Sequence, residues 1–154
     1  MQEFRAGNRS LLRLDGGEEL IGALEGFAAR HGIGAAVVGS GLGQIVRATL
    51  GYWDGSRYVP FEVTIPHELV GLTGSIAREE DRPSVHLHAV LAGPEGRAGG
   101  GHVFQATVGL LAEIGVDSFP GHAFSRPLAE ELGVRRLDLG TGPGRPAASG
   151  PPSG

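Results

Sequence analysis

Hydrophobic and polar residues alternate in several short stretches of this chain, and one longer stretch follows a helical period instead. Residues 10–14 (SLLRL) predict a first strand. In residues 15–32 the apolar positions recur at helical spacing: Leu20, Ile21, Leu24, Phe27 and Ala28. We expect a helix over 15–32, with Asp15 as its cap and a sheet or a partner covering the apolar stripe.

The stretch after the helix is rich in β-branched residues and is broken by Gly, Asp-Gly and Pro, which is typical of consecutive antiparallel strands. About three strands fit residues 33–66. The glycines of residues 39–43 (GSGLG) lack the spacing of a dinucleotide-binding loop, so we interpret them as a tight connection between strands. Further strands are expected at 67–77 and 84–93, followed by one or two over 99–119.

The C-terminal part carries weaker patterns. Residues 125–133 have a serine, a proline and then a short amphipathic run that ends in glycine, which predicts a short helix. Residues 134–139 (VRRLDL) fit an edge strand. The remaining Pro/Gly/Ser-rich residues have nothing to build a core. We therefore expect a single domain over 1–140 and a tail over 141–154.

Three of the six histidines lie within residues 84–104, around a glycine-rich turn. Histidine gains little from a half-buried strand surface, so their presence there needs a reason. Residues i and i+2 of a strand face the same side, and His86 and His88 therefore share one face. Val85, Leu87 and Ala89 take the other face.

The returning strand decides whether His102 joins this pair. If Ala92 pairs with Ala98 across a five-residue loop, His88 stands opposite His102 and all three rings share one face. A four-residue loop would turn His102 away, unless the three glycines that precede it form a bulge.

Three neutral imidazoles without a thiolate suit Zn²⁺, or another divalent transition metal, and leave a fourth position open. The alternative is that His86, His88 and His102 are surface histidines or hydrogen-bonded core histidines. Sequence spacing alone leaves both interpretations open.

Other polar residues are weaker candidates. Glu68 is a candidate catalytic base beside a metal-bound water, or a hydrogen-bond partner of a ligand histidine; the alternative is an exposed strand carboxylate. His67 and His122 lie beside Pro or Gly in predicted turns, where they complete a coordination sphere or face solvent. His31 lies at the end of the predicted helix, where it complements the helix dipole.

The composition narrows the possible functions. There is no cysteine, which excludes disulfides, thiolate metal sites and cysteine nucleophiles. The formal net charge is -4, and the 13 basic residues are all arginine and mostly scattered, so a single subunit should lack a strong phosphate-binding surface. No apolar run is long enough for export or for spanning a membrane, so we expect a cytoplasmic location.

Two motifs carry a family resemblance. Residues 86–103 (HLHAVLAGPEGRAGGGHV) combine His-x-His, a glycine turn and Gly-Gly-His, and residues 68–76 (ELVGLTGSI) contain Glu-Leu-x-x-Leu-x-Gly-Ser. Through them, and through the opening helix and residues 35–43 (AAVVGSGLG), the chain resembles the PPC domain family, a domain conserved between plants and prokaryotes. The resemblance extends over nearly all of residues 8–140.

This resemblance implies a mixed fold built on a mainly antiparallel sheet and assembled as a homotrimer. With the helices predicted above, we expect the α+β class, with a mainly antiparallel mixed sheet, one long helix and one short helix. It also implies that His86, His88 and His102 bind a metal, usually zinc. Plant members have Gly-Arg-Phe-Glu where residues 65–68 read IPHE, so plant-type partner binding is not carried over. The single Arg145 of the tail does not make the Arg-Gly-Arg-Pro core of an AT-hook, which enters the minor groove of DNA.

The sequence therefore favours a trimeric metal-binding module for a small ligand or a protein partner, without chemistry of its own. Two alternatives stay open. One is a zinc-dependent hydrolase of a small substrate, in which Glu68 transfers the proton. The other is a DNA-associated regulator whose basic surface forms only in the trimer.

Overall fold

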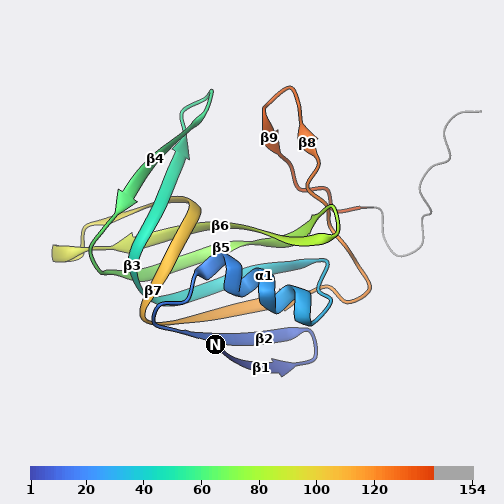
Figure 1. Ribbon diagram of the computed structural model, residues 1–154, viewed down its shortest axis with the longest axis horizontal. Coiled ribbons are helices and arrows are strands. Elements are labelled where there is room, and N and C mark those ends of the chain that lie inside the picture. The colour runs from blue at the N-terminus through green and yellow to red at the C-terminus, as the bar shows by residue number, and fades with distance from the viewer. Residues whose placement is uncertain (141–154) are drawn as a thin grey trace, which may run out of the picture.

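The computed structural model describes residues 1–140, which fold into a seven-stranded antiparallel sheet with one α-helix packed on it (Figure 1). The strand order is β1-β2-β7-β6-β5-β3-β4, and β7 pairs with β3 as well. This extra pairing makes β3, β5, β6 and β7 a closed ring of neighbours. The expected α+β class and the mainly antiparallel sheet are confirmed.

The elements follow one another in the order in which they are numbered. They are β1 (Gln2–Ala6), β2 (Arg9–Asp15), α1 (Leu20–Arg30), β3 (Ala36–Trp53), β4 (Tyr58–Val63), β5 (His67–Glu79), β6 (Arg82–Ala92), the 3-10 turn η1 (Pro94–Gly96), β7 (Ala98–Ser118), β8 (Leu128–Ala129) and β9 (Val134–Arg135). The last two strands form a separate small hairpin.

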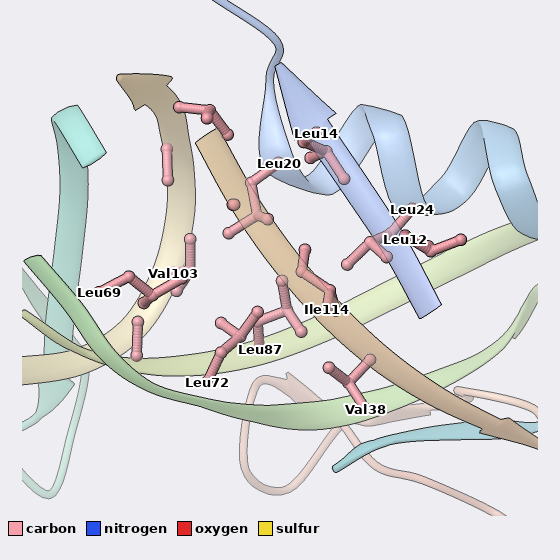
Figure 2. Packing of buried hydrophobic residues seen from close by; sticks show 14 of the residues in the cluster. Leu12, Leu14, Leu20, Leu24, Val38, Leu69, Leu72, Leu87, Val103 and Ile114 are labelled. Carbon is pink, nitrogen blue, oxygen red and sulfur yellow. The ribbon is translucent and has the colours of Figure 1, made fainter. Parts of the chain in front are cut away.

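The core lies between the sheet and α1, and strand alternation fills it (Figure 2). Leu12 and Leu14 of β2 are buried while their neighbours are exposed. Leu87 of β6 is also fully buried, and Ile114 reaches the same cluster from β7. The apolar side of α1 packs against β6 and β7 and closes the core. The face of β6 that carries its histidines therefore points away from the core.

The helix is shorter than the prediction, and Asp15 does not cap it. Asp15 is the last residue of β2, where it pairs with Leu111. Gly17 then adopts a left-handed φ of 90°, which ends the strand in a turn. The cap is Glu19, whose Oε2 accepts a hydrogen bond of 2.7 Å from the Gly22 backbone N–H. Helix α1 thus has 11 residues and is not the long helix that we expected.

The predicted number of strands over 33–66 is wrong. Two strands, β3 and β4, occupy this stretch, because β3 runs unbroken for 18 residues. The glycines of 39–43 lie inside β3 and not in a connection. Register shifts between Val38 and Ser40 and between Gly43 and Ile45 mark bulges there, which absorb glycines without ending a strand. The 99–119 region is likewise one strand, β7.

The short helix expected at 125–133 is absent from the described residues. Leu128–Ala129 and Val134–Arg135 pair as a hairpin, which replaces both the helix and most of the expected edge strand. The helical pattern makes only one turn, in which the Gly133 N–H donates to the Ala129 carbonyl at 2.9 Å. Gly133 has a φ of 65°, so it reverses the chain instead of extending the helix.

The tail predicted at 141–154 lies outside the described residues. Within residues 1–140, α1 is too short to cross a lipid bilayer.

Candidate metal centre

The hairpin between β6 and β7 has the register that places the three histidines together. Ala92 pairs with Ala98 across the five-residue loop, and His88 pairs with His102. No register shift occurs between these pairs, so the glycine bulge is not needed. Inside the loop, Glu95 and Gly96 have φ values of 62° and 72°, which let the chain turn within five residues. The predicted geometry of this hairpin is confirmed.

The three imidazole rings form a compact group on the face away from the core. Their ring centroids are 5.2 Å (His86 to His88), 4.9 Å (His86 to His102) and 5.6 Å (His88 to His102) apart. One nitrogen of each ring lies within 4.8 Å of the others. No carboxylate belongs to this group in the part of the chain that the structure describes. The cluster is therefore an all-nitrogen set of possible ligands.

Burial keeps two of these rings neutral. His86 and His102 are half-buried, whereas His88 is exposed. Desolvation lowers the pKa of His102 to about 4, with the neighbouring histidines adding to the effect. Desolvation also lowers the pKa of His86, and the charge of Arg126 lowers it further. At neutral pH both rings thus present a free lone pair, which metal coordination requires.

Two ring nitrogens lack partners. His86 Nε2 and His102 Nδ1 are buried and make no hydrogen bond to any described residue. Buried polar atoms are nearly always paired in folded proteins, so each such orphan calls for an explanation. These two atoms belong to the rings that approach most closely, at 4.9 Å. A bound ion is one occupant that gives such nitrogens a partner.

Aromatic side chains form one wall of the cluster. The ring of Tyr58, from β4, lies 4.7 Å from that of His102, and the ring of Phe104 lies 4.8 Å from it. Tyr58 also contacts Phe104 edge to face at 5.5 Å. These contacts hold the His102 ring in place and exclude water from one side of it.

Arg126 approaches the cluster from the C-terminal segment. Its Nη2 donates to the carbonyl and to the hydroxyl of Ser75, at 3.0 and 2.9 Å. Ser75 pairs with His86 across β5 and β6, so its side chain shares the face of the histidines. Our sequence reasoning missed Arg126 and Ser75. Only the β5–β6 register gives a signal for Ser75, and no local pattern points to Arg126.

The other candidate residues lie elsewhere. Glu68 is exposed and pairs with Ala92, and it is not part of the histidine group. His67 Nδ1 donates to the Ile65 carbonyl, 2.8 Å away. His122 is exposed in the turn after β7. The structure therefore brings together His86, His88 and His102 and leaves Glu68, His67 and His122 apart from them.

His31 also lies outside the cluster, at the C-cap of α1. Its Nε2 is 2.6 Å from a carboxylate oxygen of Glu3, and its Nδ1 is 2.7 Å from Arg5 Nη1. These contacts join the end of α1 to the edge strand β1, so the role of His31 is to hold these two elements together.

Comparison with known families decides the classification. Residues 1–120 match the model of the Plants and Prokaryotes Conserved (PCC) domain. The chain belongs to the PCC domain family. The match includes all three histidines, and the resemblance inferred from the motifs, under the abbreviation PPC, is confirmed.

Solved structures share this PCC fold over most of their length. The metal-containing protein of Archaeoglobus fulgidus is 34% identical, with a TM-score of 0.77 over 87% of this chain and 95% of its own. The plant- and prokaryote-conserved (PPC) protein of Pyrococcus horikoshii is 28% identical, with a TM-score of 0.74 over 88% and 93%. A proposed DNA-binding protein of Ralstonia eutropha JMP134 is 28% identical, with a TM-score of 0.82 over 90% and 96%.

A curated relative contains a similar segment. The bifunctional protein GlmU of Synechococcus sp. (strain JA-3-3Ab) is 30% identical over 129 residues, which are 83% of this chain. The chain spans only 20% of that protein. Its PCC-like segment is thus a small part of a larger molecule.

The glycines that precede His102 give a matched pair of substitutions. A Cβ on Gly100 would lie 2.2 Å from the Ala89 carbonyl oxygen, whereas a Cβ on Gly99 meets nothing within 4 Å. We expect Gly100→Ala to lower the free energy of unfolding by about 1–3 kcal/mol, because the strands must separate to admit the methyl group. Gly99→Ala should change it by less than about 0.5 kcal/mol. Urea denaturation measures both, and equal stabilities would contradict the tight approach of β6 and β7.

Proposed function

We propose that this PCC domain is a metal-binding module in which His86, His88 and His102 hold one divalent transition ion, zinc above all. The module acts as a homotrimer and receives a small ligand or a protein partner. The observation that carries the proposal is the meeting of three imidazole nitrogens within 4.8 Å of one another. Nitrogen ligands of a tetrahedral zinc ion lie about 3.4 Å apart, a separation that small ring rotations reach.

The residues fit such an ion in their chemistry. The set has three nitrogens and no thiolate or carboxylate, which suits zinc and related ions and leaves a coordination position for a further group. The orphaned nitrogens of His86 and His102 gain a partner when an ion binds. The structural similarity to a metal-containing protein of Archaeoglobus fulgidus supports the same proposal.

The trimer is supported by apolar side chains on the face away from the core. Strand register places several exposed ones on this face, among them Leu11, Val37, Leu42, Val90 and Phe104. Exposed apolar groups that cluster on one face are typical of an interaction surface. Val90 follows His88 by two residues on β6, so the apolar surface and the histidines share this face. Assembly of copies over this face would place the metal centre near a subunit boundary.

Two measurements test this proposal. Protein purified without a metal-affinity tag should contain about one divalent ion per chain by elemental analysis. Sedimentation equilibrium should give about three times the mass of one chain. A metal-free native protein would contradict the metal centre, and a monomeric mass would contradict the assembly, so the two parts of the proposal fail separately.

A DNA-associated function is the second candidate, favoured by the structural similarity to a proposed DNA-binding protein of Ralstonia eutropha JMP134. The net charge of -4 opposes it for one chain, so the trimer would have to supply a basic surface. Titration with random duplex DNA at low salt tests it, because phosphate contacts are strongest there. No association under those conditions would eliminate this candidate.

Acid should release the metal. Coordination needs neutral imidazole, and unperturbed histidine titrates at about pH 6.5. The pKa of His102 is lowered to about 4, and that of His86 is lowered too, so protons compete at these rings only at lower pH. We expect full metal content above pH 6.5 and progressive loss between about pH 6 and 4. Dialysis at each pH followed by elemental analysis measures it.

Full metal content at about pH 4 would contradict histidine ligation. The metal-free protein provides a second readout. Between about pH 4 and 6.5 the unfolded chain binds more protons than the folded chain, because the folded-state pKa of His102 lies near the lower limit. Its free energy of unfolding should therefore rise with pH across this window.

A further inference from the structure

Arg126 is a buried cation without an ion-pair partner among residues 1–140. It is 6% exposed, and it forms no ion pair with any described carboxylate. Its Nε is buried and has no hydrogen-bond partner within the same part of the chain. A buried guanidinium is unfavourable unless it is paired and fully hydrogen-bonded. The arrangement is therefore incomplete without a further group.

The guanidinium has a fixed position beside the histidine cluster. The Arg126 backbone N–H donates to the Arg78 carbonyl at 3.1 Å, and its carbonyl accepts from Arg135 Nη1 at 2.9 Å. With both backbone groups bound, its side chain reaches Ser75, the cross-strand partner of His86. Directly paired side chains on adjacent strands lie about 5 Å apart. Arg126 is thus a neighbour of the His86 ring.

The residues that the structure describes do not offer Arg126 a carboxylate within ion-pair distance. Glu79 is the acidic residue whose charge acts on Arg126, but its Oε1 is bound by Arg135 Nη2 at 2.7 Å. The histidine group contains no Asp or Glu. A divalent ion at the histidines would add two more positive charges. The local charge is then positive, because Arg135 already neutralises Glu79, and positive charge attracts an anion.

We propose that Arg126 binds the anionic group of a small ligand at this site, a carboxylate or a phosphate. The inference rests on the proposed function, because it names the class of ligand that the metal centre receives. Guanidinium N–H groups form strong charge-assisted hydrogen bonds with the oxygens of such anions. Ser75 fixes Nη2 from one side, which leaves Nε free for the ligand.

A small anion suits this position better than a side chain of a partner protein. Ser125 and Asp138 form two backbone hydrogen bonds of 2.9 Å with each other. These bonds fix the backbone next to Arg126. Arg126 as a residue is 6% exposed and offers little surface for docking. The ring of His88 is exposed, so the cluster is open to solvent on that side. A small molecule that enters there has to displace only the groups that cover Nε.

Cobalt provides the test, because its visible absorption reports changes in the groups around the ion. The protein is loaded with Co²⁺ and titrated with acetate, with inorganic phosphate and with acetamide as a neutral control. We expect the two anions to change the spectrum and acetamide to have no effect. The anion that binds more tightly tells whether the ligand is a carboxylate or a phosphate.

Variants then separate the role of Arg126 from that of the metal. Arg126→Gln should weaken anion binding about tenfold or more, since it removes a charged hydrogen-bond donor. Its affinity for Co²⁺ should be equal or higher, because a nearby positive charge is lost. Ser75→Ala, which frees the Arg126 side chain and keeps its charge, should weaken anion binding by a smaller factor. Arg9→Gln, an exposed arginine that pairs with Asp117, is the matched control.

The possible failures are distinguishable. If the native protein takes up no Co²⁺, the proposed function is wrong and this inference falls with it. If Co²⁺ binds but the anions leave the spectrum unchanged, or bind to Arg126→Gln as tightly as to the native protein, only this inference is wrong. Loss of the trimer in Arg126→Gln would show that Arg126 pairs with a carboxylate of another copy, which also overturns it.

Discussion

Protein with His88→Ala is expected to lose its metal. Removal of one of three nitrogens leaves the ion with two protein ligands, and even the loss of a residue that only orients a ligand costs about 10–100-fold in affinity. We therefore expect a decrease of more than about 100-fold. His88 is the exposed member of the cluster, so its replacement should leave the fold intact. Competition with a chromophoric chelator measures the change.

His122→Ala is the matched control, because His122 is exposed and lies outside the cluster. It should bind metal as the native chain does. Equal affinity of His88→Ala and the native protein would disprove the proposed ligand set. Unchanged circular dichroism of His88→Ala would show that a loss of metal is not caused by unfolding.

Leu87→Ala should be among the most destabilising single substitutions. Leu87 lies between two of the histidines in sequence but points into the core, where it is fully buried. Leu→Ala changes at such positions cost about 2–5 kcal/mol, because a cavity remains after the methyl groups are removed. Thermal and urea unfolding of the metal-free protein measure this cost without a contribution from bound metal.

Leu128→Ala is the corresponding control, since Leu128 of β8 is 55% exposed. We expect a change within about 0.5 kcal/mol for it. Similar costs for the two variants would contradict the assignment of Leu87 to the core. Readdition of zinc should then stabilise Leu87→Ala, because an ion that binds only the folded state shifts the equilibrium toward it.

The histidine cluster was predictable because its geometry depends on short-range rules. Strand alternation places His86 and His88 on one face, and loop length fixes the register of His102. Both rules hold over the 17 residues of one hairpin, residues 86–102. Arg126 was not predictable in this way. Its place depends on the path of the segment after β7, which no local pattern encodes.

Local rules also failed where bulges and turns decided the outcome. The glycines of 39–43 indicate a break in the chain, yet β3 continues through them with register shifts. β1 has no alternation to reveal it, because all five of its residues are exposed; pairing with β2 makes it a strand. Helix α1 begins later than predicted because Asp15 pairs with β7. The two are far apart in the sequence, so the residues around Asp15 do not reveal this contact.

Strand β7 belongs to three pairings at once, with β6 near its beginning and with β3 and β2 farther along. His102 stands where β7 changes from one neighbour to the next, since it pairs with both His88 and Gly51. An ion bound there would stabilise a strand that pairs with three other strands of the sheet. Amide hydrogen exchange should slow along β2, β3 and β7 when zinc is added, while the separate β8–β9 hairpin keeps its own rate.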